Sequence, residues 1–208
     1  AAYVFRTTDG GATYGQVAKL TADDAAAGDA FGYSVAIFEY ADSYGVWIHD
    51  PDLGPVYITT EFTQKVIVVG GFSEAAYIYG WHGGQHYSET ILTADDSVDG
   101  DRFGWSVAID GNTVVVGAPW HDNESGSAYV FLTYFGSPRL DPPLCAHPWF
   151  YKFDQVAKLT ATDAAAGDQF GISVAIAGGT IVVGAYYDDD AGSNSGSVYV
   201  FRTTDGGA

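Results

Sequence analysis

Two loops rich in carboxylates hold the side chains best suited to binding a ligand. The stretch YDDDAGSNSG covers 187–196, and HDNESG covers 121–126. Calcium takes about six to eight oxygen ligands on a backbone that curls around the ion, and both loops combine acidic side chains with glycine. Successive aspartates point in different directions, so a solvated turn, in which Asp and Asn accept hydrogen bonds from backbone amides, is the alternative. The predicted Ca²⁺ ligands are Asp188, Asp189, Asp190 and Asn194, with Ser193 beside them, and Asp122 and Glu124 in the second loop.

Two further polar patterns are weaker. Asp23, Asp24 and Asp29 lie in VAKLTADDAAAGD at 17–29 and could share an ion or cap a short turn. Asn123, followed by Glu and Ser, is the only N-glycosylation acceptor pattern in the chain, with an unmodified turn asparagine as the alternative. A glycan and a calcium ion in this loop would compete for the same space.

The histidines do not indicate a transition-metal site. His82 and His86 are four residues apart, but the two glycines between them oppose a helix and no third ligand lies nearby. His49, His121 and His147 are scattered singly, and we expect them in loops.

Motifs of catalysis are missing from the sequence. There is no GxSxG motif, and the single cysteine, Cys145, lies in a proline-rich stretch without a base at motif distance. A pair of glycosidase carboxylates could occur without a local signature, so a glycoside-active protein stays as the alternative to a non-catalytic one. Four aromatic residues could stack on sugars or belong to the core: Trp47, Trp81, Trp149 and Tyr151.

Composition excludes several classes of partner. The chain has 208 residues with 26 acidic and 8 basic side chains, a net charge of −18, which would be repelled by nucleic acid and by anionic membranes. No apolar run reaches the length of a membrane span. The aromatic-rich composition, with 27 glycines and no methionine, favours an all-β fold with many tight turns.

Internal repeats determine the predicted architecture. One motif appears three times, as AGDAFGYSVAI at 27–37, DGDRFGWSVAI at 99–109 and AGDQFGISVAI at 166–176. It is followed each time by an apolar run that ends in glycine, and a block of the form small-Tyr-aliphatic-aromatic recurs at 2–5, 76–79, 128–131 and 198–201. Each unit therefore predicts four short antiparallel strands, as in a β-propeller blade. Gly32, Gly104 and Gly171 each follow a Phe, which predicts close approach of neighbouring sheets with the Phe ring between them.

The predicted units span about 2–75, 76–127 and 128–197, within one repeat domain, and 198–208 repeats the first strand. Two stretches rich in aromatics and proline, 38–64 and 132–154, interrupt the pattern. We expect them to be ordered excursions packed on the core.

The motifs FGYSVAI, FGWSVAIDGNTVVVGAP and FGISVAIAGGTIVVGA resemble FG-GAP repeats, the blades of the integrin α-subunit head and of many surface proteins. The resemblance implies a β-propeller-like fold, an extracellular or cell-surface location and a role in adhesion or scaffolding. The DxDxDG calcium loop of the integrin type is not present in that spacing.

The decapeptide YVFRTTDGGA occurs at 3–12 and again at 199–208. It marks equivalent strands three units apart, so Tyr3, Val4, Phe5 and Tyr199, Val200, Phe201 are predicted edge-strand residues that a second copy could pair with. The sequence predicts a non-catalytic structural protein that assembles into an oligomer or filament. The alternatives are an isolated calcium-stabilised adhesion module, and a propeller that binds or hydrolyses carbohydrate; glycans and other surface proteins are further candidate partners.

Overall fold

The computed structural model describes residues 1–50, 54–82, 85–135 and 151–203. Its elements, in chain order, are β1 (Ala2–Arg6), β2 (Gly15–Leu20), β3 (Ser34–Asp50), β4 (Gly54–Gly70), β5 (Ala76–His82), β6 (Gln85–Leu92), β7 (Ser106–Asp110), β8 (Thr113–Ala118), α1 (His121–Glu124), β9 (Ser127–Phe135), β10 (Tyr151–Leu159), β11 (Ser173–Ala177), β12 (Thr180–Ala185) and β13 (Ser197–Arg202). The described part of the chain is thus almost entirely β-structure.

The strands form four antiparallel sheets, ordered β1–β2, β3–β4–β5–β6, β7–β8–β9–β10 and β11–β12–β13. In both complete sheets the strand after the FG motif comes first, followed by the apolar glycine-ended strand, the tyrosine strand and an outer strand. Within the described residues, the first sheet contains only the last two strand types and the final sheet only the first three. This arrangement confirms the predicted all-β, propeller-like array.

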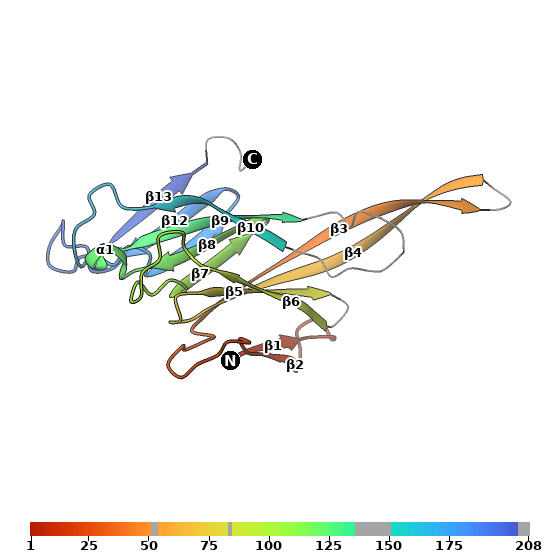
Figure 1. Cartoon of the computed structure of the whole chain (residues 1–208), viewed down its shortest axis with the longest axis horizontal. Helices are drawn as coiled ribbons and strands as arrows, with labels where there is room; N and C mark the ends of the chain where they lie inside the picture. Colours follow the sequence, from red (N-terminus) through yellow and green to blue (C-terminus); the bar gives the residue numbers. More distant parts are fainter. Residues whose placement is uncertain (51–53, 83–84, 136–150, 204–208) are drawn as a thin grey trace.

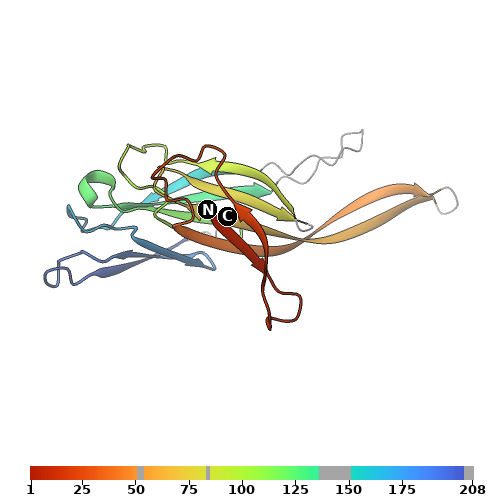
Figure 2. The same ribbon diagram turned by 90° about the horizontal axis from the view of Figure 1, so that it is seen from below.

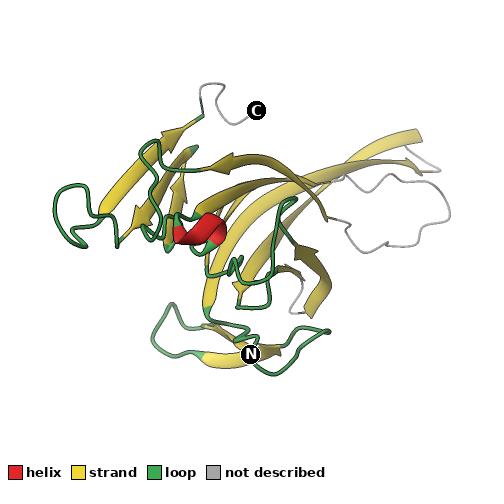
Figure 3. Ribbon diagram, turned by 60° about the vertical axis from the view of Figure 1, so that its left-hand side comes forward, coloured by secondary structure: helices red, strands yellow, loops and turns green. Residues whose placement is uncertain are grey.

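Successive sheets are packed face against face, from β1–β2 at one end of the molecule to β11–β12–β13 at the other (Figures 1 and 3). One hydrophobic cluster fills each of the three spaces between them. The middle of β8 is fully buried because sheets cover both of its faces, and Val114, Val115 and Val116 have no exposed surface. Apolar β-branched residues in an unbroken run suit such a doubly covered strand.

Among the described residues, each of the two end sheets has a neighbouring sheet on one face only. Along β13, exposed and partly buried residues alternate, with Val198 and Val200 exposed and Tyr199 and Phe201 turned towards the neighbouring sheet. Successive residues of a strand point to opposite faces, so this alternation identifies a sheet with a neighbour on one side only.

The excursion at 38–64 is a continuation of two strands. Pairing between β3 and β4 is unbroken from Ser34–Gly70 to Asp50–Gly54. We expected this segment to pack on the core; instead, the far part of the β3–β4 hairpin projects beyond the other sheets (Figures 1 and 2). Cross-strand backbone hydrogen bonds satisfy the hairpin internally, so it can extend without a covering layer.

The second excursion, 132–154, also begins and ends by lengthening strands. Residues 132–135 extend β9, and 151–154 form the start of β10, with Leu132 opposite Asp154. The remainder, 136–150, lies outside the described residues.

Candidate functional site

A close backbone contact joins successive sheets where the FG and GA turns meet. A Cβ atom built on Gly117 would lie near the carbonyl oxygen of Gly171, at 2.0 Å, and the Ser106 hydroxyl donates a hydrogen bond to that carbonyl at 2.7 Å. The preceding junction repeats the contact with Gly70, Gly104 and Ser34. The predicted close approach of sheets at the FG glycines is therefore confirmed at the second and third of the three junctions, where Gly104 and Gly171 lie.

The phenylalanine of each FG motif lies between sheets, as predicted. Phe103 and Phe170 have no exposed surface, whereas Phe31, at the first junction, is only partly buried. The buried rings contact a tyrosine of the same sheet edge-on, with centroids 5.5 Å apart for Phe103 and Tyr129 and 5.4 Å apart for Phe170 and Tyr199. Edge-to-face geometry is favourable for such pairs, so each FG motif adds specific packing to the junction.

Tyr129, Tyr199 and the equivalent tyrosine of the β3–β6 sheet, Tyr77, also donate their hydroxyls to an aspartate in the loop that enters their sheet. The three pairs are Tyr77–Asp24 at 3.1 Å, Tyr129–Asp96 at 2.8 Å and Tyr199–Asp163 at 2.8 Å. The last aspartate of the same loop caps a turn: Asp29 accepts from the Ala26 amide at 2.5 Å, and Asp101 and Asp168 make equivalent bonds. Asp24 and Asp29 therefore accept hydrogen bonds within the protein. For the stretch 17–29, this is the turn-capping role that the sequence offered as the alternative to a shared ion.

A buried histidine lies at the centre of the junction beside Tyr129. His121 is 5% exposed, with Nδ1 2.8 Å from the Asp101 carboxylate and Nε2 2.6 Å from Lys158 Nζ. Lys158 also donates to Asp96 at 2.6 Å. Since an ammonium group only donates, the geometry makes His121 Nε2 the acceptor and leaves the Nδ1 proton for Asp101. We expected His121 in a loop as an isolated residue; these partners are 20 to 37 positions away in the sequence, and no local motif connects them.

The junction changes the acidity of its members. Partial burial raises the pKa of Asp96, but hydrogen bonds from Lys158 and Tyr129 and the nearby positive charge outweigh it, so the net pKa lies below 3.8. Burial, with the hydrogen bond to Asp96, raises the pKa of Tyr129 far above its ordinary value. In the last sheet, a hydrogen bond from Tyr199 likewise lowers the pKa of Asp188. The tyrosines are therefore donors and the aspartates charged acceptors at neutral pH.

We expect Tyr129→Phe to lower the free energy of unfolding by about 1–2 kcal/mol at neutral pH, because it leaves the Asp96 carboxylate without one donor. Because the folded-state pKa of Asp96 is depressed, its ionised form stabilises the fold above the ordinary pKa of 3.8, and this contribution is lost as pH falls through the folded-state value. The penalty of Tyr129→Phe should therefore shrink in acid, as measured by urea unfolding across pH. Tyr3→Phe is the matched control, since Tyr3 has the same strand position but is 52% exposed; an equal loss in both variants would contradict the prediction.

In the acidic loop after β12, a carboxylate accepts a hydrogen bond from the backbone of the same loop. Asp188 is buried, and its carboxylate accepts a hydrogen bond from the Asp190 amide at 3.2 Å. The Tyr199 hydroxyl lies 2.8 Å from both the Asp188 and the Asp163 carboxylates, which therefore share its single proton. Asp189, Asp190 and Asn194 are exposed, and repulsion from Asp188 raises the pKa of Asp190. Across the described residues, no three His, Cys, Asp or Glu side chains form a metal-ligating group. Calcium binding by this loop stays a prediction.

The second acidic loop, 121–126, is hydrogen-bonded to the loop that enters the β11–β12–β13 sheet. Asp122, Asn123 and Glu124 all have positive φ, at 51°, 58° and 64°, so α1 is a left-handed turn rather than a regular helix. The Glu124 carboxylate accepts from the Gln169 side chain at 2.9 Å, and its carbonyl accepts from the Gln169 amide at 2.8 Å. Asp122 and Asn123 are exposed. The glycosylation of Asn123 stays a prediction.

An aromatic cluster, which sequence reasoning missed, joins two junctions. Phe72 and Trp105 stack at 5.0 Å, and the Arg102 guanidinium lies 4.5 Å from the centre of the Trp120 ring. Tyr33, 53% exposed, lies 4.7 Å from both Phe72 and Trp105. The only available signal was that the residue after FG is aromatic in two of the three repeats. Exposed aromatic faces can stack on sugar rings, and buried ones hold sheets together.

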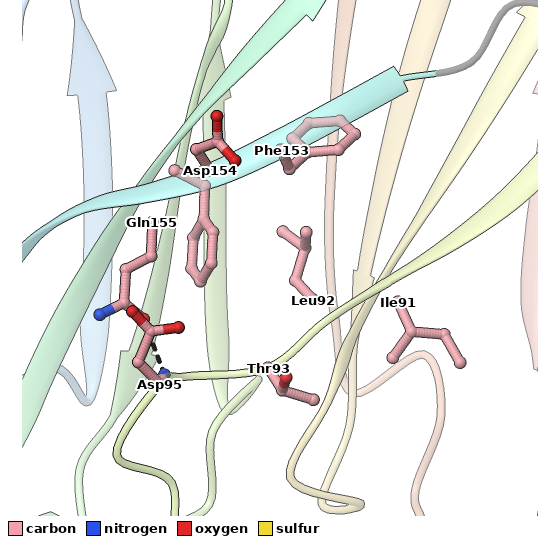
Figure 4. Close-up of a pocket in the computed structure, with 8 residues that line it drawn as sticks. Ile91, Leu92, Thr93, Asp95, Phe153, Asp154 and Gln155 are labelled. Atoms are coloured by element: carbon pink, nitrogen blue, oxygen red, sulfur yellow. Dashed lines mark hydrogen bonds between the residues drawn. The ribbon is translucent and has the colours of Figure 1, made fainter.

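A cleft of about 500 Å³ lies between the end of β6 and the first half of β10 (Figure 4). Asp95 and Gln155 lie side by side at its edge, where the Asp95 amide donates to the Gln155 side chain at 3.0 Å. The cleft also contains Asp154. It therefore places two carboxylates, Asp95 and Asp154, on the outer rim of adjacent sheets.

Other candidates fall in strands or outside the described residues. His82 ends β5 and His86 lies in β6, on paired strands rather than on a helix. Trp47 and Trp81 belong to β3 and β5, and Tyr151 begins β10. Cys145, His147 and Trp149 lie outside the described residues.

The predicted edge residues occupy the two incomplete sheets. Within the described chain, β1 pairs only with β2 and β13 only with β12, whereas β5 and β9 have partners on both sides. Tyr3 and Phe5 are 52% and 56% exposed, and Val200 is 59% exposed; Val4 and Phe201 point towards the neighbouring sheets. Each end of the array therefore combines an unpaired strand edge with exposed apolar side chains.

Repeated four-stranded sheets joined at FG and GA glycines define a propeller-type repeat protein. The FG-GAP repeat family matches residues 14–41, 87–131 and 153–201, more than half of the chain. The chain belongs to the FG-GAP repeat family, whose members are typically extracellular and adhesion-type proteins. No individual curated protein matches it. The described residues include no helix that is long and apolar enough to cross a bilayer.

Proposed function

We propose that the protein is a non-catalytic, extracellular structural or adhesion protein that self-associates through its end sheets. The observation that supports self-association is the pair of sheets β1–β2 and β11–β12–β13, each of which, within the described residues, has fewer than four strands and an open strand edge. An open edge presents unpaired backbone N–H and C=O groups that another strand can satisfy. Because the two ends differ, the contact would be head to tail and would generate a ring or a filament.

The proposal predicts a mass that rises with protein concentration. Light scattering over a range of concentrations should show species larger than 22.0 kDa, and electron microscopy should show rings or filaments. Higher salt should favour assembly, because it screens repulsion between copies that each carry a net charge of −18. A constant monomer mass under all of these conditions would contradict self-association.

We further propose that Ca²⁺ stabilises the acidic loop after β12. Support comes from the exposed carboxylates of Asp189 and Asp190, together with the repulsion that raises the pKa of Asp190 and that a cation would relieve. A ligand that binds only the folded state raises stability, so the melting temperature should fall when Ca²⁺ is replaced by a chelator. The same titration on Asp189→Asn/Asp190→Asn should show no shift; an unchanged melting temperature in the original chain would exclude this site.

Carbohydrate binding is the second candidate function, favoured by the partly exposed aromatic cluster around Tyr33 and Trp105. Aromatic faces next to a guanidinium group suit sugar rings. Binding on a glycan array that is lost in Tyr33→Ala would support this candidate, and a blank array would remove it.

A further inference from the structure

The two ends of the array expose the two halves of the contact that joins its internal sheets. In the interior, β7 packs against β3 and β4, which leaves Val107 and Ile109 only 8% and 9% exposed. The same positions of the repeat on β3 are Val35 and Ile37, and these are 59% and 57% exposed. In the part of the chain that the structure describes, the sheet in front of them contains only β1 and β2, without the two strand types that cover this face in the interior.

The opposite half of the contact is uncovered on β11 and β12. The middle valines of β4 and β8, Val68 and Val115, have no exposed surface, whereas the equivalent Val182 on β12 is partly exposed. On β11, Ala175 is exposed, while its equivalent on β7, Ala108, is 8% exposed. This end therefore shows the face that, in the interior, covers the next sheet.

The contact between a GA glycine and the carbonyl of the next FG glycine has only one of its two partners at this end, namely Gly184. Gly117 lies against the carbonyl oxygen of the next FG glycine, Gly171, and the Ser106 hydroxyl donates a hydrogen bond to that oxygen. At Gly184, the equivalent position, the three atoms nearest to a Cβ are side-chain atoms of Ser173 and Ile172. In the described part of the chain, the Ser173 hydroxyl makes no hydrogen bond. Gly32, the FG glycine of the first repeat, stands at the other end of the molecule and has the same positive φ as Gly104 and Gly171.

We propose that a second copy of this chain completes the junction: β11 and β12 of one copy cover Val35 and Ile37 on β3 of the next. The Ser173 hydroxyl would donate to the Gly32 carbonyl of the second copy, which would approach Gly184. The remaining strands of the shared sheet are the tyrosine strand and β2 of the second copy. The tyrosine strand is AYVFR in β1 and VYVFR in β13, so either copy can supply it with almost the same contacts.

This inference rests on the proposed self-association and specifies its interface. The second copy is the fitting partner because the exposed residues on each end match, position for position, those that already pack against each other inside the chain. The shared sheet would then lie between the β7–β10 sheet of one copy and the β3–β6 sheet of the next, and each of these two sheets would be covered on both faces.

The test uses one variant for each side of the interface. Ile37→Asp places a charge on β3, and Ala175→Asp places one on β11; both residues are exposed in the single chain, so folding should be retained, which thermal melting checks. Burying an unpaired carboxylate in the junction should weaken association at least about a hundredfold. Val98→Asp, at a 63% exposed residue outside both faces, is the matched control and should assemble normally.

Mixing the two variants gives a result specific to head-to-tail contact. Each variant alone should be monomeric by light scattering. The mixture should form dimers and nothing larger, because the intact β11–β12 face of Ile37→Asp can bind the intact β3 face of Ala175→Asp, and the two remaining faces are both blocked. Gly184→Ala provides a second variant on the β11–β12 side. Within the chain, the atoms nearest to its Cβ belong to the movable side chains of Ser173 and Ile172, whereas in the junction the Cβ would meet the Gly32 carbonyl of the second copy.

The outcomes separate this interface from the proposed function. If the original chain assembles but Ile37→Asp and Ala175→Asp assemble equally well, the interface is wrong and self-association stands. If the original chain stays monomeric at every concentration and salt level, self-association itself fails, and the interface with it. Closure of one chain on itself would appear in the same way, as a monomer that no variant changes.

Discussion

Replacing Gly117 by alanine should lower the free energy of unfolding by about 3 kcal/mol, because the new Cβ would meet the carbonyl oxygen of Gly171 at 2.0 Å. The clash is with backbone of the next sheet, so no side-chain rotation relieves it. The two sheets would have to separate, which would expose part of the hydrophobic cluster between them, including Val115 and Val183. Urea unfolding followed by circular dichroism measures the change.

Gly15→Ala is the matched control for this prediction. Gly15 also lies in a strand, has no positive φ, and has open space around its Cβ position. Alanine should change stability there by no more than about 0.5–1 kcal/mol, in the stabilising direction because the unfolded chain loses freedom. Equal stability of the Gly117 and Gly15 variants would show that the sheets do not approach closely at the GA turn.

Truncating Phe103 to alanine should lower the free energy of unfolding by about 4 kcal/mol. The ring has no exposed surface and packs between the middle two sheets, with Tyr129 and Phe131 edge-on against it at 5.5 and 6.0 Å. Removing the ring loses the free energy of its burial. It also leaves a cavity that the packed sheets cannot close. Denaturant unfolding should show a lower midpoint with an unchanged slope.

Phe31→Ala is the comparison within the same motif. Phe31 is only partly buried against the first hairpin, so the loss should be about half as large. A similar penalty at both sites would mean that the FG phenylalanine stabilises its own turn rather than the space between sheets.

Much of the fold could be predicted from the sequence because its determinants are local and repeated. The strand-length apolar runs and the recurring tyrosines set the strands and their order along the chain. Phe103 and Gly104 recur with their neighbours in all three repeats, so their shared role at a junction was visible before any coordinates.

The polar junction around His121 could not be predicted in this way. His121 contacts Asp101 and Lys158 only because β10 and the loop before β7 converge beside α1. The left-handed turn at Asp122–Glu124 was equally hidden, because positive φ at three non-glycine residues is maintained by contacts to the next sheet rather than by their own preferences.

The sequence by itself determined the repeat, its four strand types, the glycines at the sheet contacts and the equivalence of the two YVF strands, since each depends on residues close together in the chain. Only the tertiary structure decided which strands share a sheet, which loops engage their neighbours, and that Val35 and Ile37 are uncovered while Val107 and Ile109 are buried. Identical motifs differ in burial because burial depends on the sheet that lies next to them, and in the described part of the chain each end sheet has a neighbour on one side only.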